Sequence, residues 1–189
     1  MVNEDREYVQ QVLSGDHQTF NKLVRKYNRM AGAIAYGICG DYHGAEDIVQ
    51  EAFLKAYRSL ASLKDPRRFK FWFAGIVRTR SIDHIRRESR QRPYWSITSD
   101  AGRIGIEDEA AFRGDSVPDL FIREEFREKI LEAIRALPED DRLVVTLKHM
   151  EGLSYKEIAE IMGTTVSAVE SRLFRARSTL RRKLDRILK

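Results

Sequence analysis

Residues 153–177 read LSYKEIAEIMGTTVSAVESRLFRAR, and this stretch decides the fold of the C-terminal part of the chain. Ser154 and Glu157 have the spacing of a capping box, which predicts a helix that starts just after the serine. Gly163 predicts the end of this helix, and one of the two threonines that follow can cap another. We therefore expect two helices that are separated by a tight turn.

The second of these helices has one apolar stripe and a polar remainder. Steps of three and four residues separate its apolar positions, which are Val166, Val169, Leu173, Ala176 and Leu180. The other faces carry Ser167, Glu170, Ser171, Arg172, Arg175 and Arg177. This pattern is typical of a helix-turn-helix, whose second helix can enter the major groove of DNA. The alternative is a helical hairpin within a bundle, but basic residues opposite the core stripe favour DNA binding.

Composition limits the class of protein. The chain has 189 residues, which suits one large or two small domains, and its net charge of +5 suggests a nucleic-acid partner. Cys39 is the only cysteine, which excludes an internal disulfide and fits a reducing cytoplasm. No apolar run has the length of a membrane span and no signal peptide opens the chain, so we expect a cytoplasmic protein without membrane insertion. Regular strand patterns are absent, and an all-α fold follows.

Two helices are predicted at the N-terminus. The first runs from about Asn3 to Leu13, and its inward residues are Tyr8, Val9, Val12 and Leu13. Asp16 lies in the next turn and can cap the second helix, which stops near Gly40.

A third helix has the clearest periodicity in the chain. Its stripe consists of Ala45, Ile48, Val49, Ala52, Phe53, Ala56, Tyr57 and Leu60. The opposite surface carries Glu46, Asp47, Gln50, Glu51, Lys55 and Arg58. Taken alone, such a surface is more often solvated than part of an interface.

The segment 67–87 combines aromatic and basic residues. Helical spacing predicts a core made of Phe69, Trp72, Phe73 and Ile76, whereas Phe71 lies off this stripe. The surrounding basic residues are Arg67, Arg68, Lys70, Arg78, Arg80, Arg86 and Arg87. Cations for phosphates and flat faces for bases are what unpaired nucleic acid requires. A solvated basic helix is the alternative, and the residues alone leave both open.

Residues 93–118 have two flanking prolines, several glycines and no sustained period, which predicts a flexible linker. This linker would join a domain at 1–92 to a domain at 119–189. In the second domain, Asp119 can cap a helix with the apolar residues Phe121, Phe126, Ile130, Leu131, Ile134 and Leu137. Pro138 opens a further helix, which carries Leu143, Val144, Leu147 and Met150. The predicted fold is therefore two small helical domains, the second with the helix-turn-helix.

The motifs together resemble the sigma factors of bacterial RNA polymerase, specifically the two-domain extracytoplasmic-function type. GDHQTFNKLVRKY at 15–27 resembles the opening of that family, and GAEDIVQEAFLKAY at 44–57 its core-polymerase-binding helix. FKFWFAGIVRTRSIDHIRR at 69–87 resembles the promoter-melting segment. LPEDDRLVVTLKHMEGLSYKEIAEIMG and SRLFRAR resemble the C-terminal domain. Four motifs in this order, with a linker in the matching gap, make the resemblance specific.

The resemblance assigns roles by position. Contacts to the clamp of the polymerase β′ subunit fall on Asp47, Gln50, Glu51, Phe53, Lys55 and Arg58. Minus-ten DNA contacts fall on Arg67, Arg68, Lys70, Phe71, Arg78, Thr79, Arg80, Asp83, Arg86 and Arg87. Minus-thirty-five contacts fall on Thr165, Ser167, Glu170, Ser171, Arg172, Arg175 and Arg177. The implied function is an alternative sigma factor, and the implied partners are RNA polymerase core, including its β flap, promoter DNA and an anti-sigma factor.

Two departures from the family pattern bear on base selection. Many members have Asn where this chain has Thr79, and many have Gly-Thr-Val followed by Lys or Arg where this chain has Ser167 to Glu170. A carboxylate near the groove is repelled by phosphate but can accept from a cytosine amine. The preferred promoter sequence is therefore expected to differ from that of better-known members.

Two other function classes compete with this interpretation. An autonomous helix-turn-helix regulator would bind duplex DNA as a dimer, but no heptad seam predicts a dimer. An enzyme is disfavoured because the histidines lack metal-ligand spacing and there is no phosphate-binding glycine loop or nucleophile elbow. These histidines are His17, His43, His84 and His149. We expect no metal and no cofactor.

Overall fold

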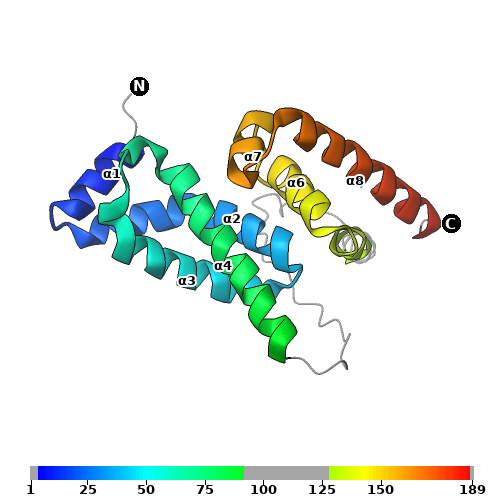
Figure 1. Cartoon of the computed structure of the whole chain (residues 1–189), viewed down its shortest axis with the longest axis horizontal. Coiled ribbons are helices and arrows are strands. Elements are labelled where there is room, and N and C mark those ends of the chain that lie inside the picture. Colours follow the sequence, from blue (N-terminus) through cyan, green and yellow to red (C-terminus); the bar gives the residue numbers. More distant parts are fainter. Residues whose placement is uncertain (1–3, 92–127, 188–189) are drawn as a thin grey trace, which may run out of the picture.

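The structure is a computed structural model that describes residues 4–91 and 128–187. All regular elements in these two ranges are helical, which confirms the predicted all-α class (Figure 1). The predicted linker at 93–118, and with it Asp119, Phe121 and Phe126, lies outside the described residues. None of the described helices has the length and hydropathy to span a membrane.

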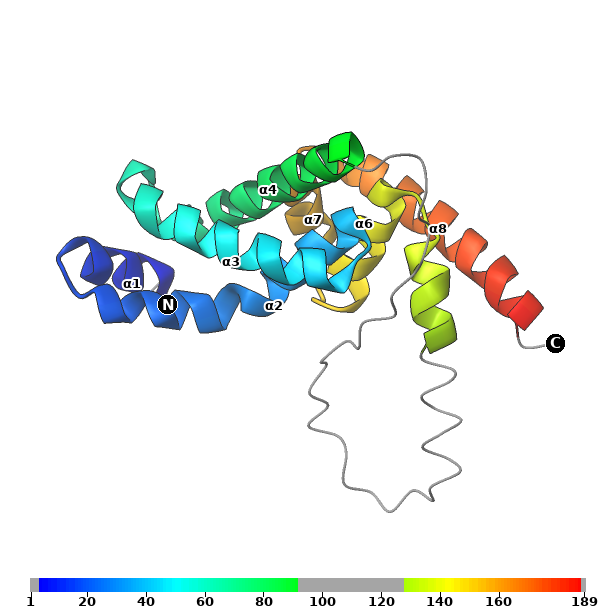
Figure 2. The same cartoon turned by 90° about the horizontal axis from the view of Figure 1, so that it is seen from below.

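The N-terminal domain is a bundle built around one long helix. Its α-helices are α1 (Glu4–Leu13), α2 (Phe20–Cys39), α3 (Tyr42–Ser59) and α4 (Phe69–Gln91). Short 3-10 turns occur at His17–Thr19, Leu60–Ser62 and Pro66–Arg68. Helix α2 packs against α1, α3 and α4, and α3 also packs against α4 (Figure 2).

Local sequence signals explain where these helices begin and end. The side chain of Asp16 accepts from the backbone N–H of Thr19, so it caps the 3-10 turn that leads into α2. Asp41 caps α3 in the same way by accepting from Gly44. Gly40 ends α2 with a φ of 73°, a left-handed conformation that glycine adopts without steric cost.

Aromatic rings fill the centre of the N-terminal domain. Phe69 and Phe73 on α4 are fully buried, and Phe53 on α3 stacks on Phe73 with 4.4 Å between ring centroids. Trp72 and Ile76 are only partly buried at the edge of this core, whereas Ala74 and Val77 lie inside it. The predicted core stripe of α4 is therefore correct at Phe69 and Phe73. Beyond Phe73, the core positions are Ala74 and Val77, and the predicted Ile76 lies at its edge.

Three residues that were predicted to be buried reach the surface instead. Leu13 is 50% exposed, Tyr57 is 39% exposed and Val166 is 36% exposed. Each stands at an end of its helix, where the neighbouring elements no longer cover the apolar stripe.

The C-terminal domain contains a helix at 128–135, α6 (Glu139–His149), α7 (Tyr155–Met162) and α8 (Val166–Ile187). Ser154 and Glu157 form the predicted capping box, and Gly163 ends α7 with a φ of 64°. The Thr165 hydroxyl accepts from the backbone N–H of Ala168 and so caps α8. Helices α7 and α8 are the predicted helix-turn-helix, and their shared core contains Ile158, Val169 and Leu173.

The two domains pack against each other through α2 and α6 (Figures 1 and 2). Seven consecutive residues of α6, 141–147, are buried, because one side of the helix faces α7 and α8 while the other faces α2. Gly37 permits this close approach: a Cβ atom at Gly37 would lie 2.9 Å from the Cα atom of Leu143. The apolar cores of the two domains form one continuous cluster.

Arg142 joins the domains at the end of α2. Its guanidinium is buried and donates to the carbonyl oxygens of Gly37 at 2.9 Å and Ile38 at 2.8 Å. It also donates to the carbonyls of Arg135 and Leu137 in its own domain. Burial lowers the pKa of Arg142, but the partly negative carbonyls at the C-terminus of α2 favour a cation there.

Candidate functional site

The polar face of α3 is exposed as expected. Asp47, Gln50, Glu51, Lys55 and Arg58 all lie on the surface. Phe53, which was assigned to the same interface, is buried at 8% exposure against Phe73, so it supports this face mainly from within. Glu51 Oε2 lies 3.6 Å from Arg87 Nη2, which links this face to α4.

An apolar groove between α2 and α3 adjoins this polar face. It encloses about 440 Å³, and its lining includes Val24, Gln50, Phe53, Leu54 and Tyr57. Leu54 is 57% exposed, although it directly follows the buried Phe53 on α3. Leu54 was not among the predicted site residues. It could have been identified as a large apolar residue that lies one position outside the buried stripe of α3, because that stripe already fills the side of the helix that faces the core.

The basic residues of α4 and the preceding turn fall into two groups. Arg67 and Arg68 lie in the turn and Lys70 lies beside Phe71 in the first turn of α4, whereas the remaining assigned residues lie between Arg78 and Arg87. Thr79 is exposed, and its hydroxyl donates to the carbonyl of Gly75 at 2.9 Å. Its hydroxyl oxygen still has acceptor capacity toward a base or a sugar.

Phe71 is not fully on the surface, although it lies off the predicted stripe. It is half-buried, like Trp72, and packs against the edge of the core. The guanidinium of Arg68 and the ammonium of Lys70 lie 5.8 Å and 5.7 Å from its ring centroid. This arrangement of cations around a partly exposed ring suits a splayed base with its phosphate.

Two of these cations are bound to the C-terminal domain. Lys70 Nζ lies 2.5 Å from Glu157 Oε1 on α7, and Arg68 forms an ion pair with Glu160 on the same helix. The hydrogen bond from Lys70, together with the capping bond from Ser154, lowers the pKa of Glu157 to about 2. Helix α7 therefore neutralises two of the cations at the start of the basic segment.

The exposed side of α8 carries the assigned polar residues and one ring. Ser167, Glu170, Ser171, Arg175 and Arg177 are on the surface. Phe174 lies among them with 77% of its surface exposed. Phe174 was not among the predicted site residues. Like Leu54, it is an apolar residue outside the core stripe of its helix.

Two arginines of α8 are held by α6. Arg172 is half-buried and donates to Asp140 at 2.7 Å, and Arg175 donates to Asp141 at 3.1 Å. Asp141 is buried, so its pair with Arg175 is partly shielded from water, whereas Asp140 is more than half exposed. Arg175 thus has a structural contact in addition to any contact with DNA.

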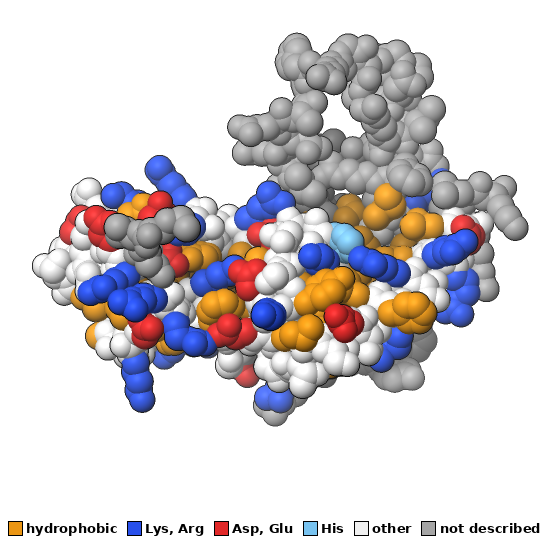
Figure 3. All heavy atoms as spheres, turned by 90° about the horizontal axis from the view of Figure 1, so that it is seen from above, with side chains coloured by type: hydrophobic (Ala, Val, Ile, Leu, Met, Phe, Trp, Pro, Cys, Tyr) orange, Lys and Arg blue, Asp and Glu red, His pale blue; other side chains and the backbone are white. Residues whose placement is uncertain are grey.

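Charges of both signs are interspersed on the face of the molecule that Figure 3 shows. Figure 3 shows Lys and Arg side chains over both domains, with Asp and Glu between them and apolar side chains in the gaps. The positive side chains on this face are therefore partly compensated by neighbouring carboxylates.

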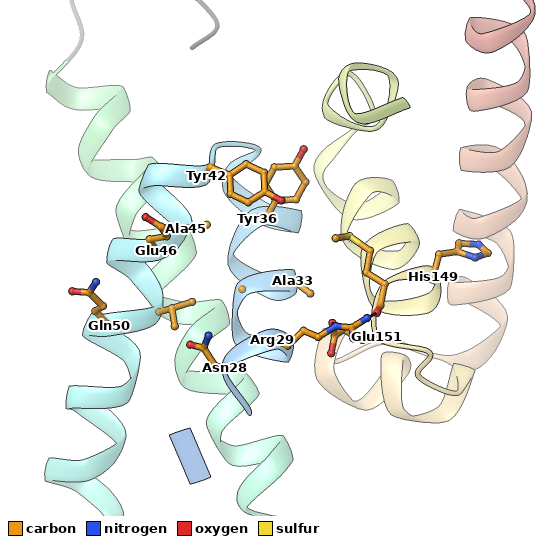
Figure 4. Close-up of a pocket in the computed structure, with 13 residues that line it drawn as sticks. Asn28, Arg29, Ala33, Tyr36, Tyr42, Ala45, Glu46, Gln50, His149 and Glu151 are labelled. Atoms are coloured by element: carbon orange, nitrogen blue, oxygen red, sulfur yellow. Dashed lines mark hydrogen bonds and ion pairs between the residues drawn. The ribbon is translucent and has the colours of Figure 1, made fainter. Parts of the chain in front are cut away.

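A second cavity lies where the two domains meet. It encloses about 850 Å³ between α2, α3 and the turn that follows α6. Figure 4 shows Arg29 and Glu151 directed toward each other across its edge, with 2.9 Å between Nε and Oε1. Burial raises the pKa of Glu151. No group of His, Cys, Asp or Glu within the two described ranges could hold a metal ion.

Comparisons with known proteins agree with this arrangement. Residues 23–91 match the family described as Sigma-70 region 2, and residues 127–180 match Sigma-70, region 4. The chain is 35% identical over 191 residues to the ECF RNA polymerase sigma-E factor of Escherichia coli K12, with 98% of this chain and 96% of that protein covered. It is 32% identical to the RNA polymerase sigma-H factor of Pseudomonas aeruginosa, with 98% and 96% covered.

Two solved structures have the same fold. CnrH in complex with the cytosolic domain of CnrY matches with a TM-score of 0.64 and 28% identity, over 96% of this chain and 97% of CnrH. The sigma factor RpoE from Bartonella quintana, in complex with the anti-sigma factor NepR, matches with a TM-score of 0.63 and 22% identity. That second match covers 88% of this chain and 96% of the other.

Proposed function

Because the chain belongs to the extracytoplasmic-function sigma factors of bacterial RNA polymerase, we propose that it directs the core enzyme to specific promoters and initiates transcription there. The observation that carries this proposal is one chain with two matched parts: a basic, aromatic helix in region 2 and a helix-turn-helix in region 4. The proposed domain limits of 1–92 and 119–189 are supported by family matches that end at residue 91 and begin at residue 127.

The N-terminal domain would bind the polymerase through α3. The charged residues of the polar face would pair with opposite charges on the partner. The adjoining groove would accept an apolar ridge, such as one side of a helix from the β′ clamp, against Leu54 and Tyr57. Charged rims and a small apolar centre are typical of specific protein interfaces.

Promoter opening would use α4. Cations at Arg78, Arg80, Arg86 and Arg87 can neutralise phosphates, and the half-buried ring of Phe71 can receive an unpaired base of the minus-ten element. Melted DNA is stabilised when a base that leaves the duplex gains a stacking partner. The chain itself would carry out no covalent chemistry, since the polymerase core makes the RNA.

The C-terminal domain would read the minus-thirty-five element with the exposed side of α8. Ser167, Glu170 and Ser171 lie in the first turns of this helix, which in a helix-turn-helix is the part that contacts base edges. We also propose an anti-sigma factor as a partner in the cytoplasm, which is supported by two neighbours whose structures contain CnrY and NepR.

Reconstitution tests this function directly. The full chain is mixed with core polymerase and a library of promoter fragments, and the start sites of the transcripts are mapped. We expect specific transcripts only when both proteins are present, and weak duplex binding by the chain alone. Tight sequence-specific binding by the isolated chain that core polymerase does not change would favour the rival function, an autonomous regulator.

A further inference from the structure

Helix α8 is longer than its packing against α6 and α7 requires. Among its described side chains, Ala176 is the last that is buried, and Leu180 is only partly buried against the core. The helix nevertheless continues to Ile187 and reaches one end of the molecule (Figures 1 and 2). About three helical turns therefore extend beyond the core of the helix-turn-helix.

The extending part carries two cations that have no ion-pair partner in the part of the chain that the structure describes. These are Arg181 and Arg182, and both are exposed. They differ in this respect from Arg172 and Arg175, which donate to carboxylates of α6. The positive charge at this end of α8 is therefore available to a partner.

Both cations lie on the side of α8 that carries the proposed base-reading residues. Arg181 follows Phe174 by seven residues and Arg182 follows Ser171 by eleven, which correspond to about two and three complete helical turns. Side chains at such intervals stand almost in line along the helix. When the first turns of α8 face a DNA duplex, the two guanidinium groups face the same duplex.

The length of α8 determines which part of the duplex they meet. Arg181 lies about 17 Å along the axis from Glu170, because each residue of an α-helix adds about 1.5 Å. The major groove is about 12 Å wide, and a straight helix cannot follow its curve around the duplex. A helix whose first turns lie in the groove has therefore left it at Arg181 and passes over the sugar–phosphate backbone.

We infer that the second half of α8 binds backbone phosphates beside the minus-thirty-five element through Arg181 and Arg182. This inference rests on the proposed function and adds a contact outside the bases that α8 would read. An acidic protein surface would also attract these cations, but their alignment with the reading side of α8 favours DNA. Contacts to phosphates add affinity and fix the position of the helix, and they carry no sequence information.

The salt dependence of promoter binding tests the inference. Full-length wild type and Arg181→Ala with Arg182→Ala are each assembled with core polymerase and titrated with one promoter fragment. Each phosphate contact contributes about 0.9 to the slope of log affinity against log salt concentration. Between about 50 and 200 mM salt, the wild type should therefore lose about tenfold more affinity than the double variant. The preferred minus-thirty-five sequence should be the same for both.

Three further variants separate the two contacts from a general effect of charge. Arg181→Lys with Arg182→Lys should retain the wild-type slope, because a phosphate can be neutralised by either cation. Lys183→Ala is the matched control, since it removes one charge from a half-buried position that lies about 100° around the helix from Arg182. It should also retain the slope. Asp185→Asn removes the only acidic residue that follows Glu170 in the sequence and should raise the affinity.

Uncharged phosphates locate the contact on the DNA. The phosphates on both flanks of the minus-thirty-five element are replaced in turn by methylphosphonates, which carry no charge. At the contacted positions, the replacement should weaken binding of the wild type and have little effect on Arg181→Ala with Arg182→Ala. Only a direct contact produces this dependence of one change on the other.

Failure of the inference and failure of the proposed function give different results. If the wild type and the double variant have the same slope and respond equally to every methylphosphonate, Arg181 and Arg182 do not bind the backbone. A double variant that instead loses affinity for core polymerase itself would assign these residues to an acidic protein surface. If the wild-type holoenzyme shows no binding that depends on a minus-thirty-five element, the proposed function is wrong.

Discussion

Arg175 on α8 donates a hydrogen bond to Asp141 on α6, with 3.1 Å between nitrogen and oxygen. The carboxylate is buried, while most of the arginine side chain is exposed. Arg175, which is predicted to contact DNA, therefore also connects α8 to α6 within its domain. Its two roles have different consequences when it is removed.

Arg175→Ala should lower the free energy of unfolding of the C-terminal domain. The change leaves the buried Asp141 without this partner, and an unsatisfied buried group costs about 1–3 kcal/mol. Arg172→Ala is the control, because its partner Asp140 is more than half exposed and such pairs contribute about 0–1 kcal/mol. Urea unfolding of both variants and of Arg175→Ala with Asp141→Asn measures the difference. Equal stability of the two single variants would contradict this account.

Leu54→Ala should weaken binding to core polymerase and leave stability nearly unchanged. Leu54 lines the groove with 57% of its surface exposed, so its side chain contributes little to the free energy of folding. Docking of a partner in the groove would bury this surface and add a hydrophobic contribution to binding. Truncating a central interface residue commonly costs about 1–2 kcal/mol, a fivefold to thirtyfold loss of affinity. The matched control is Leu13→Ala on α1, because Leu13 is similarly exposed and lies outside this groove. Equal affinities for the two variants would place docking elsewhere.

Phe71→Ala and Phe73→Ala should fail in different ways. Phe73 is fully buried between Phe53 and Phe69, so its loss should cost about 3–5 kcal/mol of stability. Phe71 is half-buried beside two cations, so its loss should cost less and reduce open-complex formation. Thermal unfolding and permanganate footprinting of promoter DNA separate the two effects. Trp72→Ala should cost less stability than Phe73→Ala, because Trp72 is partly exposed.

Acid should weaken the contact between α7 and α4. The pKa of Glu157 is about 2 in the folded chain, below the value of about 4.3 that an unfolded glutamate has. The ion pair with Lys70 therefore contributes its full stability above about pH 4.3 and loses it as the pH falls toward 2. Arg68, in the 3-10 turn just before α4, forms the second pair with Glu160 of α7. The radius of gyration between pH 5 and 3 should increase more for the wild type than for Glu157→Gln; parallel curves would contradict this.

Local signals made much of the fold predictable. The capping box at Ser154, the glycine at the end of α7 and the stripe of α3 act within one or two helical turns, so they can be read without knowledge of the partner elements. The helix-turn-helix and the order of the helices follow from such signals. Exposed Leu54 and Phe174 were missed because periodicity identifies what a helix buries and says little about apolar residues outside the stripe.

The packing of the domains against each other could not be predicted in this way. Residues 141–147 are all buried, yet only three apolar residues in this range followed the predicted stripe. Burial of Arg142 depends on carbonyl groups at the end of α2, which is about a hundred residues away in the chain. Gly37 showed no turn pattern because it lies inside a helix, and its role becomes visible only when Leu143 is placed against it.

Glu170→Ala should relax the choice of bases at the minus-thirty-five element while overall affinity holds or rises. Glu170 is exposed near the start of α8, one turn after Ser167 and one turn before Phe174. A carboxylate there can accept from a cytosine amine and is repelled by phosphates, so its removal costs selectivity and lowers the repulsion. Glu170→Arg should go further and shift the preference toward guanine, which presents two acceptors in the major groove.

A promoter library randomised over the minus-thirty-five element, transcribed by each variant holoenzyme, measures both effects at once. Ser178→Ala serves as a control, since Ser178 is exposed on the same helix two turns further from its N-terminus. We expect that control to keep the wild-type preference and yield. A uniform loss of transcription in Glu170→Ala with the preferred sequence unchanged would assign Glu170 to packing or to the local structure of α8, because only a residue that discriminates between bases alters their ranking.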